Sequence, residues 1–520
     1  MKRADLLTVT AYTSALRLFG QIIAFVSGLT ISANFGATNA TDSYYAALIL
    51  PAALANLVIN ILTNLFAPIY LKHIHHDSAQ QHPILSSLAF VASLALAVGV
   101  IISLAAVPVS LTLRNLPTHD MIMQASIFGF AFVALTPLIG FTRLLSVICE
   151  AHGRYLLPAS AALLNPLIFV LTLLLTTHNM GIYSLLCANL GGQIAELLIL
   201  VAFARRSLQI SFRLSLRLHP AVREMLVQSL APAVTYIALF FVPTFDRTAA
   251  ATLNVGSLTA FQFGERVVTV FDLIIMGSVI TVISNYWAQR AAELDIHAAA
   301  HSFNPVISNL LFVLVPLSLG GFLLSHPIIS VLFQHGLFTA DESSAQVFGL
   351  LFLSAPLNYL IVLTVRLLLI AKDVRTQMIL ALGISMLNTV LNILFAPLFG
   401  LAGIALSTLL ARAFILALSY PLLQRRLPTI NIRPILPNLA RTLLSAMVML
   451  IVLLFLQSPL SPALSRTYGL LPQILALSVM IGVGGSAYLC AASLIRHSEF
   501  ISLRQILVEQ VSRCFGAYKI

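Results

Sequence analysis

Long apolar segments separated by short polar connections follow one another along the chain. Fourteen of them are long enough to span a membrane, for which a helix needs about 18 or more mostly apolar residues. They cover approximately residues 8–34, 43–71, 86–111, 121–149, 155–176, 180–204, 225–246, 256–289, 305–333, 344–371, 376–399, 401–424, 438–458 and 469–495. The pattern predicts an all-α polytopic membrane protein with about 14 transmembrane helices.

The composition of the chain supports this class. Hydrophobic residues make up 59% of the 520 residues, charged residues make up 9%, and the mean hydropathy is +0.99. A soluble domain could not bury so much apolar surface. The four cysteines lack the spacing of a metal site or a disulfide framework, and no Walker-type phosphate loop occurs. We therefore expect no metal, no cofactor and no ATP hydrolysis.

The distribution of basic residues predicts the orientation. With fourteen spans both termini lie on one side, and placing them in the cytoplasm puts 20 of the 28 Lys and Arg residues in cytoplasmic segments. The opposite loops hold Arg114, Arg247 and Arg466. Membrane topology thus explains the net charge of +11, and nucleic acid is not an expected partner. We expect a multi-pass protein of the cell inner membrane with both termini in the cytoplasm.

The chain also has two weakly similar halves. On each side of a basic connector, an Asn precedes a Gly-Ile pair by a similar distance, with Asn165 and Gly181 in the first half and Asn388 and Gly403 in the second. Two six-helix lobes of this kind would enclose a central cavity at the membrane midplane. The predicted domains are an N-terminal lobe (1–204), a basic cytoplasmic linker (205–224), a C-terminal lobe (225–424), and two extra C-terminal helices with an amphipathic tail (425–520).

Several charged residues fall deep inside predicted spans. In the segment 256–289, Gln262 and Arg266 are four residues apart, and Glu265 and Asp272 are seven apart, so two neighbouring stripes of one helix are polar. Such groups are costly in hydrocarbon and usually face a watery cavity or a partner. One side of this helix is therefore expected to face water within the membrane. The other deep or nearby charges are Arg17, Arg143, Arg412, Asp42, Glu196 and Asp246. For each arginine the alternative is a structural pairing within the helix bundle.

Five motifs occur in an order that resembles a known family. They are NFGATNATDSYYAALILP, DRTAAATLNVGSLTAFQFGERV, VLFQHGLFTADESSA, AKDVRTQ and PLFGLAGIALSTLLA, within residues 8–424. The chain is similar to the MurJ/MviN flippases of the multidrug/oligosaccharidyl-lipid/polysaccharide exporter superfamily. The resemblance implies a fourteen-helix flippase that moves an undecaprenyl-diphosphate-linked glycan, such as lipid II, from the inner to the outer leaflet. Membrane lipids and the cell-wall synthesis machinery are the implied partners.

The resemblance also implies site residues. Arg266 matches the family's arginine on the eighth helix, and Asp42 matches an acidic residue that opens the second helix. The two first-helix arginine positions fall on Gln21 and Ser27, and the second-helix arginine and glutamate positions fall on Ala55 and Asn60. Arg17, one turn before Gln21, could substitute for one missing charge. These departures leave room for another lipid-linked polysaccharide as substrate.

The chemistry of these side chains is consistent with a diphosphate clamp. Guanidinium groups bind phosphate through bidentate, charge-assisted hydrogen bonds, so we expect Arg266, Arg17 and Arg143 to hold the headgroup. Glu265 is expected to keep Arg266 from binding too tightly. A coupling ion, or a gate, would involve Asp42, Asp246 or Asp272. The alternatives are a drug/cation antiporter of the same superfamily and a membrane scaffold without transport activity.

Overall fold

The fold is known from a computed structural model, which describes residues 3–61, 81–113, 119–207, 218–293, 296–333, 336–338, 342–464 and 469–501. All regular elements in these ranges are helical. They are α1 (Arg3–Phe35), α2 (Asn39–Ile61), α4 (Gln81–Leu113), α5 (His119–Val133), α6 (Leu135–Ala151), α7 (Leu156–Met180), η3 (Gly181–Tyr183), α8 (Ser184–Ser207), α9 (Pro220–Ala251), α10 (Ser257–Ile274), η4 (Ile275–Ile280), α11 (Thr281–Glu293), α12 (Ile296–His301), α13 (Phe303–Leu323), α14 (Ser325–Phe333), α15 (Glu342–Ile370), α16 (Val374–Arg426), α17 (Ile435–Leu464) and α18 (Leu470–Leu494).

Helices suited to a membrane dominate the described part of the chain. Nine helical stretches in it are long and apolar enough to cross a membrane. Two of them, Leu156–Arg206 and Val374–Arg426, are 51 and 53 residues long, and each covers two of the segments predicted from hydropathy. The helical geometry breaks at a glycine with positive φ in each, Gly181 (φ 54°) and Gly400 (φ 59°). Only glycine adopts this conformation without strain, so each break falls at a glycine.

The remaining predicted spans fall on helices outside these nine stretches. Segments 43–71, 225–246 and 256–289 coincide with α2, with α9, and with α10 through α11, as far as these residues are described. Asp42, Asp246 and Arg266 belong to these helices. The predicted all-helical, polytopic class is confirmed.

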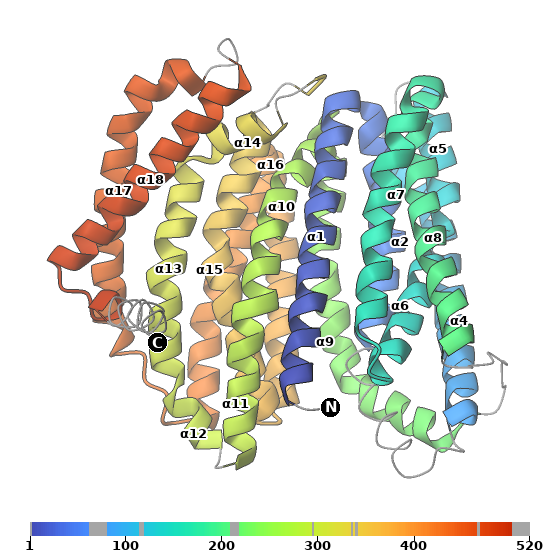
Figure 1. Ribbon diagram of the computed structural model, residues 1–520, viewed down its shortest axis with the longest axis horizontal. Helices are drawn as coiled ribbons and strands as arrows, with labels where there is room; N and C mark the ends of the chain where they lie inside the picture. The colour runs from blue at the N-terminus through green and yellow to red at the C-terminus, as the bar shows by residue number, and fades with distance from the viewer. Residues whose placement is uncertain are drawn as a thin grey trace, which may run out of the picture. The chain divides into compact units, whose positions relative to one another are not determined.

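The chain forms two compact units, which are described separately. The first contains Met1–Arg266, Phe333–Thr339 and Ala381–Leu401, and the second contains Val267–Leu332, Ala340–Leu380 and Ala402–Ile520. In the first, α7 packs between α1 and α8, and α2 packs against α5, α6 and α9 (Figure 1). In the second, α13 packs against α15 and α17, and α17 packs along α18 (Figure 1). The predicted division into lobes around residues 205–224 stays a prediction.

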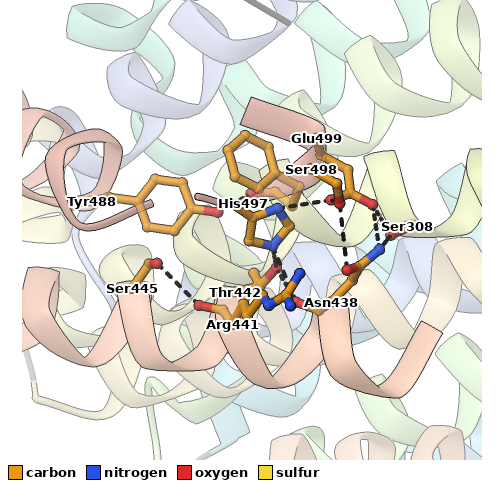
Figure 2. Close-up of polar contacts among 10 residues, drawn as sticks. Ser308, Asn438, Arg441, Thr442, Ser445, Tyr488, His497, Ser498 and Glu499 are labelled. Atoms are coloured by element: carbon orange, nitrogen blue, oxygen red, sulfur yellow. Dashed lines mark hydrogen bonds and ion pairs between the residues drawn. The ribbon is translucent and has the colours of Figure 1, made fainter. Parts of the chain in front are cut away.

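A buried polar cluster attaches the C-terminal helix pair to α13 in the second unit (Figure 2). The imidazole of His497, which follows α18, is fully buried. Its Nε2 lies 2.9 Å from the Thr442 hydroxyl and 3.1 Å from the Asn438 carbonyl oxygen, both on α17. Its Nδ1 lies 2.7 Å from the Glu499 carboxylate. The Thr442 hydroxyl also donates to the Asn438 carbonyl oxygen at 3.0 Å, so His497 is packed against a polar stretch of α17.

Glu499 completes this cluster. Its carboxylate accepts from Asn438 Nδ2 at 2.7 Å and from the hydroxyls of Ser308 on α13 and of Ser498. Burial raises the pKa of Glu499, but the hydroxyl donors Ser308 and Ser498 and the neighbouring His497 together hold the pKa below its ordinary value. The predicted amphipathic tail begins here, and its residues 502–520 lie outside the described part of the chain.

Candidate functional site

The Arg266 guanidinium of α10 lies against the backbone of α1. Its Nη2 donates to the Ala24 carbonyl oxygen at 2.8 Å and to the Ser27 hydroxyl at 3.3 Å. A Cβ atom on Gly28 would lie 2.4 Å from Nη1 of Arg266, so this close approach requires glycine. Both contacts are to neutral oxygens, and within the described residues no carboxylate pairs with this half-buried side chain. The positive charge of Arg266 is therefore uncompensated in this conformation.

Glu265, next to Arg266 in sequence, has a different partner. Its two carboxylate oxygens accept from Nε and Nη2 of Arg247 on α9, each at 3.1 Å. The side chains are 22% and 30% exposed, respectively. The hypothesis that Glu265 moderates anion binding by Arg266 therefore has no support from this pairing. Gln262, one turn before Arg266, is half-buried.

Asp42 at the start of α2 caps the N-terminus of α10. Its buried carboxylate accepts from Gly256 N at 2.6 Å, from Thr259 N at 2.8 Å and from the Thr259 hydroxyl at 2.6 Å. These backbone donors have no partner within their own helix, and the helix dipole favours a negative charge at this end. The Thr259 hydroxyl also lies 3.1 Å from the Thr41 hydroxyl. Asp42 thus joins α2 to α10, although the two are distant in sequence.

A second connection closes the same end of the first unit. Leu337 N donates to the Ala33 carbonyl oxygen, near the end of α1, at 2.9 Å. Gly336, with φ at 69°, lies so close to Ala33 that a Cβ atom would clash with its backbone. Phe338 is buried, and its ring packs edge-on against Phe263 of α10, with the centroids 5.1 Å apart. In this conformation the segment 336–338 and Asp42 together hold α1, α2 and α10 at this end.

The other predicted members of the clamp lie apart from Arg266. Arg17 on α1 forms an ion pair with Glu150 on α6, at 2.9 Å, and its side chain is 60% exposed. Arg17 lies two helical turns, or roughly 10 Å along α1, from Ala24, where Arg266 binds. Gln21 and Arg143 are exposed. In this conformation Arg17 and Arg266 have separate partners, and a joint clamp of the two would require another conformation. The role of Arg143 in the clamp stays a prediction.

Asp246 of α9 lies in a buried amide environment of the first unit. Asn392 of α16 donates to its Oδ1 from Nδ2 at 2.6 Å, and Asn388 lies 3.3 Å from the same Nδ2. All three side chains are buried. Hydropathy identified Asp246, but the two asparagines are too distant in sequence for any spacing rule to connect them to it.

Asp272 belongs to the second unit. Its Oδ1 accepts from the Tyr359 hydroxyl of α15 at 2.6 Å, just before the π-helix η4 interrupts the regular hydrogen bonding of the α10–α11 segment. Arg412 of α16, also predicted to be deep, donates to the buried Ser354 hydroxyl at 2.6 Å. Polar side chains thus satisfy one another in the interior of this unit, as expected of ionisable groups inside a membrane.

A comparison with protein families decides the classification. The model of the family described as lipid II flippase MurJ matches residues 31–471. The chain belongs to the MurJ family. A relative named probable lipid II flippase MurJ from Thermotoga maritima is 24% identical over 400 residues, covering 75% of this chain and 80% of the relative. A relative of the same name from Vibrio cholerae is 27% identical over 248 residues, covering 47% of each chain.

Solved structures agree on the fold. The structure of lipid II flippase MurJ in an inward closed conformation has a TM-score of 0.75 at 18% identity, covering 93% of this chain and 98% of that chain. A multidrug resistance MATE family transporter of the MOP superfamily, inward-facing, has a TM-score of 0.65 at 12% identity and covers 80% of this chain and 98% of its own. The resemblance to MurJ noted from five sequence motifs is therefore confirmed. At these identities the structural likeness concerns the fold alone.

Proposed function

We propose that this MurJ family member is a flippase that moves a lipid II-like, undecaprenyl-diphosphate-linked glycan from the inner to the outer leaflet. The family match and the names of the relatives support the substrate class. In this proposal the protein spans the cell inner membrane with both termini in the cytoplasm, as the excess of basic residues on one side favours. The protein transports its substrate without breaking a covalent bond.

The observation that carries this proposal is the charge of Arg266. Charged side chains inside a membrane pair with opposite charges or with backbone carbonyls, and Arg266 contacts a carbonyl and a hydroxyl, with no carboxylate partner among the described residues. Its charge is therefore available to an anion, and a diphosphate offers several oxygens to its N–H donors. A cation as cargo would instead be repelled at this position, which favours the flippase over a drug/cation antiporter.

Asp42 has a distinct role in this proposal. With the N-terminus in the cytoplasm, the end of α1 and the start of α10 lie on the outer side. The hydrogen bonds of Asp42 to Gly256 and Thr259 then close the outer side while the headgroup enters from the inner side. Release of the glycan requires these bonds to break. We assign Asp42 to the gate and Arg266 to the headgroup.

The membrane potential supplies a driving force in this scheme. Outward movement of negative charge is favoured by an interior-negative potential and gains roughly 2.3 kcal/mol per charge per 100 mV. Asp246 and Asp272 stay candidates for ion coupling. Partners among cell-wall synthesis proteins belong to the proposal as well, since they would supply and consume the transported glycan.

The decisive experiment measures flipping in proteoliposomes. Purified wild-type protein should translocate lipid II faster than other prenyl-diphosphate glycans and much faster than an unrelated phospholipid. Arg266→Ala should lower the rate at least about 10-fold, because charge-assisted hydrogen bonds contribute about 1.5–3 kcal/mol each. Arg425→Ala, which removes an exposed arginine at the end of α16, serves as control and should leave the rate unchanged. Equal rates for the wild type and Arg266→Ala would refute the proposal.

A further inference from the structure

We propose that Tyr45 of α2 is a further substrate-recognition residue, whose hydroxyl donates to the diphosphate beside Arg266. This inference rests on the proposed function and extends it from a single charge to a two-residue site. It also predicts which part of the headgroup the protein recognises. This part is an anion with several oxygens, which accept hydrogen bonds from a phenol and a guanidinium together.

The O–H of Tyr45 is buried without an acceptor. The side chain is 7% exposed, and within the described part of the chain no acceptor of suitable geometry meets its hydroxyl, while the neighbouring Arg266 acts on it as a donor. Leaving a buried hydroxyl unsatisfied costs about 1–3 kcal/mol, so such groups are rare and call for an explanation. A ligand that is bound in another step of the transport cycle would supply the missing acceptor.

The neighbouring cation is Arg266. The Arg266 guanidinium acts on the Tyr45 hydroxyl through its charge and as a hydrogen-bond donor, so the two groups share one environment. Arg266 uses Nη2 for its contacts with Ala24 and Ser27. A guanidinium carries five N–H donors, so Arg266 can bind an anion in addition to these two oxygens. A phosphate oxygen can therefore accept from Arg266 while another oxygen of the same headgroup accepts from Tyr45.

The adjacent tyrosine provides an internal comparison. Tyr44 is equally buried, but its hydroxyl accepts a hydrogen bond from Asn189 of α8 at 3.2 Å. Its ring packs edge-on against Phe132 of α5, with the centroids 5.6 Å apart. Tyr44 is thus satisfied by the helix bundle itself. The contrast indicates that Tyr45 lacks an acceptor for a reason specific to its position near Arg266.

Access to Tyr45 follows from its place on α2. It lies one helical turn after Asp42, which holds the start of α10 in this conformation. When Asp42 releases α10, the covered Tyr45 hydroxyl becomes accessible from the same side as Arg266. Tyr45 therefore contacts the headgroup as the outer side opens, and it completes the site during the transition.

Binding measurements on the full-length protein in nanodiscs test this inference. The probes are undecaprenyl diphosphate and undecaprenyl monophosphate, and the variants are Tyr45→Phe, Tyr44→Phe and Arg266→Ala. Tyr45→Phe removes only the hydroxyl and should weaken diphosphate binding about 10-fold, with a smaller loss for the monophosphate. Tyr44→Phe should leave the ratio of the two affinities unchanged. Tyr45→His, which keeps an N–H donor, should recover part of the loss.

The outcomes separate the two proposals. If Tyr45→Phe binds the diphosphate as the wild type does while Arg266→Ala does not, the role of Tyr45 is refuted and the proposed function stands. If Arg266→Ala also binds normally, the headgroup site itself is refuted. The melting temperature of Tyr45→Phe should equal or exceed that of the wild type, because a buried, unsatisfied hydroxyl is removed. A lower affinity together with a lower melting temperature in both tyrosine variants would mean a packing role only, and would overturn the inference.

Discussion

Substitution of Asp42 by Asn tests the gate assigned above. The carboxylate accepts from two backbone N–H groups and one hydroxyl at the start of α10, at 2.6–2.8 Å. An asparagine has the same size but only one side-chain oxygen. Its amide nitrogen replaces the second carboxylate oxygen and, being a donor itself, cannot accept the hydrogen bond that this oxygen accepted. The substitution therefore removes the negative charge and at least one hydrogen bond without creating a cavity.

The expected effect on the gate is large. A hydrogen bond to a charged group contributes about 1.5–3 kcal/mol, and a charge at a helix N-terminus adds about 0.3–1 kcal/mol, or up to about 2 kcal/mol when it is partly buried. A loss of about 3 kcal/mol shifts the equilibrium between closed and open states roughly 100-fold toward the open state. Asp42→Asn should therefore open the outer side even without substrate.

Thiol labelling measures this shift. Ala260 of α10 is 2% exposed, so Ala260→Cys in a chain whose four native cysteines are replaced should react slowly with a membrane-impermeant maleimide. Adding Asp42→Asn should accelerate labelling at least 10-fold. Asp373→Asn is the matched control, since Asp373 caps α16 through Thr376 N at 3.1 Å in the other unit. Unchanged labelling in Asp42→Asn would refute the gate.

Three further changes have defined outcomes. Gly28→Ala places a methyl group 2.4 Å from the Arg266 guanidinium and should lower lipid II flipping about as much as loss of that arginine. Gly191→Ala, in open space on α8, should leave flipping unchanged. Equal flipping by both variants would show that the close approach of Arg266 to Gly28 is not needed for transport. Glu265→Gln breaks a partly exposed ion pair and should change the free energy of unfolding by about 1 kcal/mol or less in a denaturation assay. The pKa of Glu499 is lower in the folded protein than its ordinary value, so its contribution to stability is present above about pH 4.5 and is lost as the pH falls below that value. Thermal unfolding of Glu499→Gln between pH 7 and pH 3 should depend less on pH than that of the wild type.

The local sequence was sufficient to predict the helices and to identify Arg266 as a charged residue deep within one of them. Hydropathy depends on each segment alone, and all predicted spans fall on helices in the described part of the chain, including pairs divided at Gly181 and Gly400. Arg266 stood out because its depth in an apolar helix follows from counting residues. The order of five motifs was enough to identify the family, which the family model confirmed over residues 31–471.

Tertiary structure alone decided the partners of these residues. The cap that Asp42 forms on α10 and the contact of Asn392 with Asp246 join helices that are far apart in sequence, and the pairing of Glu265 with Arg247 joins the consecutive helices α10 and α9. No local periodicity encodes such pairs, because they depend on how helices pack and which faces meet. The amino-acid sequence by itself determined which segments are helical and apolar, since that depends on the side chains of each segment. Which charges are neutralised, and which stay available to a ligand, was determined only by the packing of the folded chain.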